Sequence, residues 1–304
     1  MANSLESNDS RLPLGCPLPI VDLEAIAKAA RREIVKTVTL AKGGHLGGPL
    51  SATDILVALY FRVLNIRPEE PAWPERDRFI LSKGHSSIAL YVILALRGFF
   101  PLQELQTFDA LNSRLQGHPD MNALPGLDMS TGSLGLGLSA AVGVAMGAKL
   151  AGARFATFVM VGDGECNEGV VWEAAHVAQR NHLDNLVVVV DENKLQQFGW
   201  GGLFGKRQAP YADGELRSRW TAFGWNVSEV DGHDIAAVIE ALERARTVEG
   251  APAVIIAHTV KGKGVSFMEG NFRWHSQIPT EVELAAALSE LSASSTQPIA
   301  SRHE

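Results

Sequence analysis

Short apolar runs alternate with amphipathic helical patterns along most of this sequence, and this alternation restricts the possible folds more than any other feature. Between the apolar runs, apolar residues recur at spacings of three and four, as on one face of a helix. Strands that are buried on both faces and joined through helices form parallel sheets. We therefore predict an α/β fold with a parallel sheet and helices on both faces. The predicted strands span residues 78–82, 155–161, 186–190, 226–230 and 253–259, and the clearest helices span 51–64, 87–98, 169–183 and 234–248.

The 304 residues suffice for one large domain with its own core. We expect a loose N-terminal arm over residues 1–19, a single domain over residues 20–292 and a polar tail over residues 293–304. The arm lacks the basic and apolar segments of a signal peptide. The uncharged stretch 129–148 is rich in glycine and serine, so we predict a loop followed by a buried helix there and not a membrane span.

Charge and cysteine content exclude several classes of protein. A formal net charge of −7, without any cluster of Lys and Arg, leaves no basic face for nucleic acid. The two cysteines, Cys16 and Cys166, form neither a disulfide framework nor a metal-binding pattern. The sequence therefore predicts a cytoplasmic protein with reduced thiols that binds neither nucleic acid nor membranes.

An acidic turn between two glycines follows the second apolar run. In VGDGECNEG (161–169), Asp163 lies between Gly162 and Gly164, so that the backbone can approach a bulky ligand closely. Asn193 follows the next apolar run, 30 positions after Asp163. Because ligands bind beyond the carboxyl ends of parallel strands, an Asp oxygen, an Asn oxygen and a loop carbonyl are expected to lie together there. Such oxygen donors suit Mg²⁺, with Ca²⁺ as a possible substitute, and predict a metal-bridged diphosphate site.

A GDG sequence alone is as often a plain polar turn as a binding site. The Asn that follows the second strand favours a site, because GDG followed after about thirty residues by Asn is the pattern of thiamine-diphosphate enzymes. Residues 161–194 resemble that pattern throughout. We therefore predict thiamine diphosphate as the cofactor.

Four histidines occupy loop positions beside glycine, proline or the end of an apolar segment. A single histidine in a loop is more often a cap or a surface residue than a catalyst. Four of them on separate loops of one sheet favour a shared site. They are His45 in KGGHLGGPLS, His85 in LSKGHSS, His118 in QGHPD and His275 in FRWHSQ.

These motifs occur in an order that resembles the transketolases, and in particular the half of a transketolase that binds the cofactor diphosphate. The resemblance runs from about residue 20 to about residue 280, and it implies a thiamine-diphosphate-binding fold. An ordered series is far more specific than any one motif. The series is GGHLGGPLS, LSKGHSS, GHPD, STGSLGLGLSAAVGVAMG, GDGECNEG, DENK and VKGKGVSF with WHS.

The resemblance implies roles at the cofactor residue by residue. Asp163, the side chain of Asn193 and the backbone carbonyl of Leu195 would hold Mg²⁺. Gly164 would offer its amide to the diphosphate. The full set implied to contact the cofactor comprises His85, Gly132, Ser133, Leu134, Asp163, Gly164, Glu165, Asn193 and His275.

The resemblance also implies the catalytic residues. His45, His85, His118 and His275 would surround the oxygens of the substrate, and His85 and His275 would also touch phosphate or the reacting centre. An unperturbed imidazole pKa of about 6.5 suits proton shuttling near neutral pH. Glu168 and Glu173 would lie toward a dimer interface, where the family uses carboxylates to couple two cofactors.

The implied activity is that of a transferase of EC class 2.2.1, which moves a two-carbon ketol unit from a ketose, expected to be phosphorylated, to an aldose. Single-chain transketolases continue with a domain that binds the aminopyrimidine ring and supplies the activating glutamate, whereas this sequence ends first. We therefore expect the N-terminal subunit of a split transketolase, active only with a separate C-terminal, pyrimidine-binding subunit in a heterotetramer of two copies each. A smaller departure is Lys83, where single-chain members usually have Asn.

Two other functions stay open on the sequence. The α subunit of a 2-oxoacid dehydrogenase is also split and also carries GDG and Asn, although the loop histidines suit a polyhydroxylated sugar better. A non-catalytic cofactor-binding subunit is the second alternative, which the retention of four loop histidines disfavours.

Overall fold

A five-stranded parallel sheet forms the centre of the computed structural model, which describes residues 18–197, 200–201, 207–208 and 211–292. The strand order is β1-β2-β3-β7-β6, and all four pairings are parallel. The five predicted strands are confirmed, with small shifts at their ends. They are β1 (Arg78–Leu81), β2 (Thr157–Gly162), β3 (Leu186–Glu192), β6 (Asn226–Asp231) and β7 (Ala253–His258).

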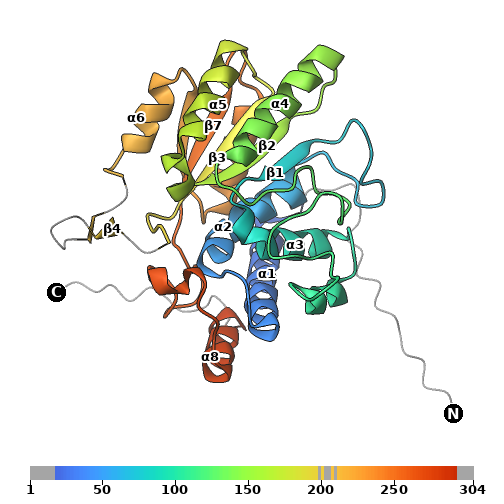
Figure 1. Cartoon of the computed structure of the whole chain (residues 1–304), viewed down its shortest axis with the longest axis vertical. Coiled ribbons are helices and arrows are strands. Elements are labelled where there is room, and N and C mark those ends of the chain that lie inside the picture. Colours follow the sequence, from blue (N-terminus) through green and yellow to red (C-terminus); the bar gives the residue numbers. More distant parts are fainter. Residues whose placement is uncertain (1–17, 198–199, 202–206, 209–210, 293–304) are drawn as a thin grey trace.

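Helices cover both faces of the sheet, as predicted (Figure 1). Alternate strand residues point to opposite faces, so Phe158 and Met160 belong to one core and Val159 and Val161 to the other. The first core also takes in α1 (Ile20–Ala41), α2 (Gly47–Ala58), α3 (Ser87–Arg97) and α7 (Ile235–Arg246). The second takes in α4 (Leu136–Ala151), α5 (Gly169–Arg180) and α6 (Glu215–Ala222).

The predicted helices are confirmed, but some of their ends differ and two further helices were not predicted. The helix predicted over 51–64 begins four residues earlier, as α2, and continues as a π-helix over Leu59–Val63. The helix expected late in 129–148 is α4, and α8 (Glu281–Ser292) packs on α1. Helices α1 and α6 were not predicted, nor was the antiparallel pair of two-residue strands β4 (Trp200–Gly201) and β5 (Arg207–Gln208).

The ends of the chain are tested little by the structure. The expected tail over 293–304 and all of the expected arm except Leu18 and Pro19 lie outside the described residues, as does Cys16. Cys166 is a buried free thiol, and the expected reduced state of the two cysteines stays a prediction. In the described segments, no helix has both the length and the apolar character required to cross a bilayer.

Candidate active site

The turns that follow β1, β2, β3 and β7 meet at one edge of the sheet and line a cavity of about 290 Å³. This is the edge at which open parallel sheets bind ligands. Loops from elsewhere complete the wall. Gly84 permits one close approach, because a Cβ there would lie 2.8 Å from the backbone carbonyl of Thr131. The cavity therefore gathers segments that lie far apart in the sequence.

Asp163 leaves β2 at the floor of this cavity, and its side chain is buried. Its two carboxylate oxygens accept hydrogen bonds from the backbone amides of Gly164, at 2.8 Å, and Lys194, at 2.9 Å. Burial and the neighbouring Asp191 raise the pKa of Asp163 to about 6. A buried carboxylate that ionises this reluctantly is one that a bound cation would stabilise.

Asn193 and Leu195 bring two further oxygens to the same wall, as the sequence predicts. Asn193 Oδ1 accepts from the Leu195 amide at 3.1 Å, and the Leu195 carbonyl accepts from Lys261 Nζ at 3.0 Å. Among residues 18–197 and 211–292 no group of three or more His, Cys, Asp or Glu side chains is arranged as a metal site. A cation here would therefore rest on one carboxylate, one amide oxygen and one carbonyl, a donor set that fits Mg²⁺ with phosphate and water ligands.

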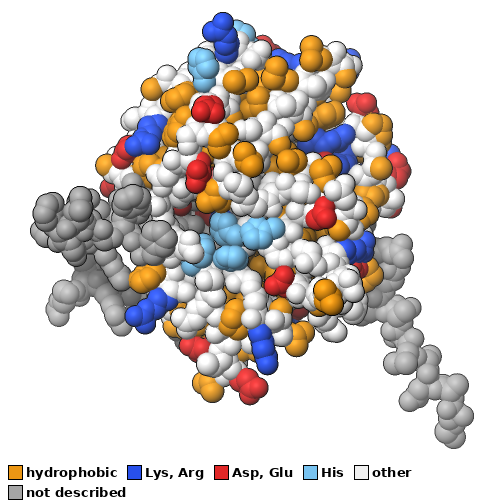
Figure 2. All heavy atoms as spheres, in the orientation of Figure 1, with side chains coloured by type: hydrophobic (Ala, Val, Ile, Leu, Met, Phe, Trp, Pro, Cys, Tyr) orange, Lys and Arg blue, Asp and Glu red, His pale blue; other side chains and the backbone are white. Residues whose placement is uncertain are grey.

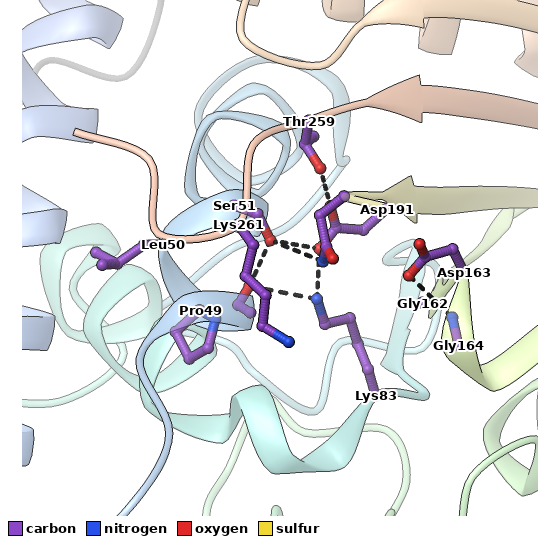
Figure 3. A network of polar contacts seen from close by, with 12 residues as sticks. Pro49, Leu50, Ser51, Lys83, Gly162, Asp163, Gly164, Asp191, Thr259 and Lys261 are labelled. Carbon is purple, nitrogen blue, oxygen red and sulfur yellow. Dashed lines mark hydrogen bonds and ion pairs between the residues drawn. The ribbon is translucent and has the colours of Figure 1, made fainter. Parts of the chain in front are cut away.

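A buried ion pair between Lys83 and Asp191 lies next to the floor of the cavity. Lys83 Nζ pairs with Asp191, and both side chains are almost completely buried, with 2% and 0% of their surfaces exposed. Figure 3 shows Thr259 bonded to the same carboxylate from the opposite side, and Ser51 adds a bond of 2.7 Å. Although burial alone would raise it, Lys83 and these hydrogen bonds hold the pKa of Asp191 below its usual value. Lys83 also donates to the Gly48 carbonyl at 3.2 Å, so the pair joins β3 and the start of α2 to the turns that follow β1 and β7.

Lys261 supplies a second ammonium group to the cavity wall. Its side chain is buried, and Nζ lies 3.0 Å from both the Leu195 carbonyl and His275 Nδ1. Burial and the nearby Lys83 lower the pKa of Lys261 to about 8, so the amine is largely charged at neutral pH. A cationic group beside the Asp163 carboxylate and a metal would suit the oxygens of a diphosphate.

Three of the four predicted histidines form a compact triangle at the cavity. The ring centroids of His45, His85 and His275 lie 5.0 to 5.2 Å apart. Figure 2 shows histidine side chains gathered at the centre of this face. Burial lowers the pKa of His45 to about 4, of His85 to about 2 and of His275 to about 3, with further lowering by nearby Lys and His side chains.

The expectation that these imidazoles have an unperturbed pKa of about 6.5 is wrong for the three histidines of the triangle. Partial removal from water disfavours the charged ring. The three rings are therefore neutral near pH 7, able to donate from one nitrogen and accept at the other.

The remaining predicted residues lie at the rim or further out. His118 is exposed and lies beside Gly132, where a Cβ would come 3.6 Å from its ring. Gly132 and Leu134 line the cavity, whereas Ser133 between them is exposed. The two predicted interface carboxylates, Glu168 and Glu173, are exposed at and near the start of α5.

Glu165 is placed in the cavity wall, but its carboxylate is already engaged. It accepts from the amide of Gly135 at 2.7 Å, from the amide of Gly162 at 3.0 Å and from the Ser82 hydroxyl. Burial raises its pKa. Glu165 thus ties the turns after β1 and β2 to the loop before α4, and its direct contact with a cofactor stays a prediction.

Several wall residues were not predicted from the sequence, namely Gly48, Lys83, Gln196, Gln197 and Lys261. Two of them carried a signal. Lys83 stood out as a departure from the usual Asn, and Lys261 lies inside the VKGKG motif. A lysine in a loop is normally a solvated surface residue, and nothing local indicated that these two are buried.

Comparison with known proteins places this geometry in a family context. Residues 23–303 match the family model described as "Transketolase, thiamine diphosphate binding domain". The chain is 44% identical over 271 residues to one subunit of the apulose-4-phosphate transketolase of Actinobacillus succinogenes, covering 89% of this chain and 96% of that protein. It is 41% identical over 271 residues, with the same coverage, to a subunit of the 6-deoxy-6-sulfo-D-fructose transketolase of Clostridium sp. strain MSTE9.

A solved transketolase from Campylobacter jejuni superposes with a TM-score of 0.81 at 32% identity. The match covers 90% of this chain and 43% of that chain, so this chain spans less than half of that protein's length.

Proposed function

The chain belongs to the transketolase family, as its thiamine diphosphate binding domain, and on that premise we propose that it is the diphosphate-binding subunit of a two-subunit transketolase. In this proposal residues 20–292 form the domain, and the enzyme works in the cytoplasm, where the free thiol of Cys166 would persist. The donor is a ketose that carries a terminal anionic group, as the names of both relatives indicate for those proteins. We expect a phosphate there, with a sulfonate as the alternative.

One observation carries the proposal. Three neutral imidazoles converge, with centroids 5.0 to 5.2 Å apart, on a cavity whose wall also holds Asp163, Asn193 and Leu195. The first set suits the hydroxyls and carbonyl of a sugar, and the second suits a metal-bound diphosphate. The pairing of these two sets favours a ketose substrate over a 2-oxoacid.

Within this site we assign roles to the residues of the wall. Asp163, Asn193 Oδ1 and the Leu195 carbonyl would hold Mg²⁺. Lys261 would contact the diphosphate, and so would Gly164, although its amide donates to Asp163 Oδ1 in this structure. The bound cofactor would supply an electron sink for breaking the carbon–carbon bond next to the ketose carbonyl.

The histidines act on the sugar. Each neutral ring can accept a hydrogen bond from a substrate hydroxyl at one nitrogen and donate to an oxygen from the other. His45, His85 and His275 would orient the ketose and move protons on its oxygens, and His118 would contact it at the rim. The cavity disfavours the charged imidazolium form of these histidines. A ring would therefore take up a proton only when negative charge develops on a nearby substrate oxygen.

Assembly with other chains is the second part of the proposal. The outer face of α4 carries the exposed Leu136 and Leu150 together with Gly143 and Gly147. Apart from adjacent residues and nearby helix backbone, a Cβ at either glycine would have no atom of the described segments within 4 Å. An uncharged face that its own chain leaves open is typical of an interface. We propose that a second copy packs there, near Glu168 and Glu173, and that two pyrimidine-binding subunits complete a heterotetramer.

The first experiment tests the cofactor site. Asp163→Ala should abolish Mg²⁺-dependent binding of thiamine diphosphate while the circular dichroism spectrum is retained. An unchanged affinity in calorimetric titration would contradict the cofactor site. The chain purified alone should show no ketol transfer, and the cognate second subunit should restore it. Robust transfer by this chain alone would contradict the split-enzyme assignment, and normal complex turnover after replacement of His45, His85 and His275 would favour a non-catalytic subunit.

A further inference from the structure

We propose that His233, which lies outside the cavity wall, is a positioning residue that holds Lys261 in place at the diphosphate end of the cavity. The inference rests on the function proposed above for Lys261. It starts from a continuous set of buried and part-buried hydrogen bonds that runs from α1 to the segment just after β7.

The first link is a buried ion pair between two helices. Arg31 on α1 makes two hydrogen bonds to Asp54 on α2, of 2.9 and 2.6 Å, and both side chains are only 7% exposed. Arg31 also donates twice to the Leu50 carbonyl, at 3.2 and 3.3 Å. Although burial opposes it, Arg31 and His233 hold the pKa of Asp54 below its usual value. Asp54 is therefore a fixed acceptor.

The second link sets the proton on the His233 ring. Its Nδ1 lies 2.7 Å from Asp54 Oδ2, and its Nε2 lies 2.8 Å from the backbone nitrogen of Val260. The Val260 amide can only donate, so Nε2 must be the unprotonated nitrogen. The Nδ1 proton then faces Asp54. A carboxylate that fixes the tautomer and orientation of a working histidine is the arrangement often found behind metal ligands.

The third link is the peptide bond between Val260 and Lys261, which connects the His233 contact to the cavity wall. Val260 directly precedes Lys261, whose side chain lies so close over Gly47 that a Cβ there would be 2.7 Å from Lys261 Cγ. On the far side of Lys261, the Gly262 amide donates to the Gly47 carbonyl at 3.0 Å. His233 and Gly47 thus hold the backbone on the two sides of Lys261. The ammonium group in turn lies 3.0 Å from the Leu195 carbonyl and from His275 Nδ1.

The physical reason for such a support is that Lys261 is a flexible side chain with a charged end in a buried position. Without the bond at Val260, the 259–261 segment could move and the ammonium group could leave its contacts for water. The cost would appear as weaker diphosphate binding, although His233 itself touches no part of the cofactor site.

The test compares two replacements that separate the two ends of the ring. His233→Gln keeps an acceptor at the depth of Nε2, whereas His233→Asn is too short to reach the Val260 amide. In calorimetric titrations of the full chain with thiamine diphosphate at saturating Mg²⁺, we expect roughly a tenfold loss of affinity for His233→Asn. We expect His233→Gln to stay within about threefold of the wild-type affinity.

A double-mutant cycle distinguishes positioning from a general structural role. Lys261→Met should weaken binding by roughly tenfold or more, and adding His233→Asn to it should cost almost nothing further. A control is His182→Ala, which removes a ring-to-backbone hydrogen bond, of 2.9 Å between Nδ1 and the Gly250 carbonyl, on an exposed surface outside the cavity wall. That control should leave the affinity unchanged.

A second readout needs no cofactor. The rate at which acetic anhydride modifies Lys261, followed by mass spectrometry of the full chain, should rise in His233→Asn, because Lys261 is only 2% exposed in the wild-type chain and would become more accessible. If Lys261→Met binds the cofactor normally, the proposed role of Lys261 is refuted, whereas a raised acetylation rate would still support the contact through Val260. Additive losses in the cycle, an unchanged acetylation rate, or a His233→Gln variant as impaired as His233→Asn would overturn the inference. Should His233→Asn fail to fold, the near-wild-type behaviour expected of His233→Gln in both readouts remains the deciding result.

Discussion

Replacing Lys83 by methionine should destabilise the chain more than any change at its partly exposed ion pairs. Methionine has a similar length and fills much the same space, but it removes the ammonium group that faces Asp191. The Asp191 carboxylate, which is completely buried, would then lack its only cationic partner among the described residues. Its bonds from Ser51 and Thr259 would remain.

The magnitude follows from this geometry. Removing one partner of a buried ion pair costs about 3–5 kcal/mol, because the other charge is left uncompensated away from water. The two surviving hydroxyl donors place the expected loss near the lower limit, at about 3 kcal/mol. The bond from Lys83 to the Gly48 carbonyl is lost as well, so a value well below this range is not expected.

Urea unfolding followed by circular dichroism measures this loss against a matched control. Lys149→Met breaks the ion pair with Asp184, whose N–O distance is 2.7 Å but whose side chains are 39% and 31% exposed. Such a pair contributes about 0–1 kcal/mol. Adding Asp191→Asn to Lys83→Met should recover much of the loss, since the carboxamide no longer carries a buried charge.

A loss of unfolding free energy in Lys83→Met no greater than that in Lys149→Met would refute this prediction. A double variant less stable than Lys83→Met alone would refute it as well, because the charge left on Asp191 would then not be the source of the loss.

Three further predictions concern the sugar site, acid stability and assembly. In the active complex, His118→Ala should lower kcat/KM for the ketose by roughly tenfold or more while the affinity for thiamine diphosphate barely changes; a collapse of cofactor binding would place His118 at the wrong end of the site. Burial holds the pKa of His45, His85 and His275 far below about 6.5, so in acid the unfolded chain binds more protons than the folded chain. The free energy of unfolding should therefore fall as the pH is lowered from about 6.5 to about 4. The contribution of His85 to this fall is up to about 1.4 kcal/mol per pH unit. His85→Asn should flatten that slope in urea titrations, and an unchanged slope would contradict the lowered pKa. Gly143→Arg should leave the fold intact, because the position is open and arginine favours helix, but should dissociate the proposed pair of copies in sedimentation experiments; an unchanged mass would refute the α4 interface.

The sequence alone predicted the five strands, most of the helices and a parallel sheet between helices, but not the strand order, because the patterns that identify single elements are local. Each strand is a short apolar run and each helix repeats its apolar residues every three or four positions, so neighbours along the chain suffice to recognise them. The missed α1 carries the same spacing at Leu23, Ala27, Ala30 and Ile34. The sequence signal for α1 was therefore as local as that of the helices that were predicted.

The candidate metal ligands were also accessible from the sequence, for a topological reason. Asp163 and Asn193 each follow a strand, and parallel strands bring their carboxyl ends to one edge. No knowledge of side-chain packing is needed for that inference, and the structure places both residues in one cavity wall.

Only the tertiary structure decided which charges are buried and what they face. Lys83 and Asp191, which form a buried ion pair, are 108 positions apart. The ring of His233 contacts Val260 with one nitrogen and Asp54 with the other, and Asp54 precedes His233 by 179 positions. The histidines differ from their expected pKa for the same reason: solvent removal depends on every segment that closes over a side chain. Strand and helix patterns repeat along the chain, whereas desolvation and long-range pairing exist only once the chain has folded.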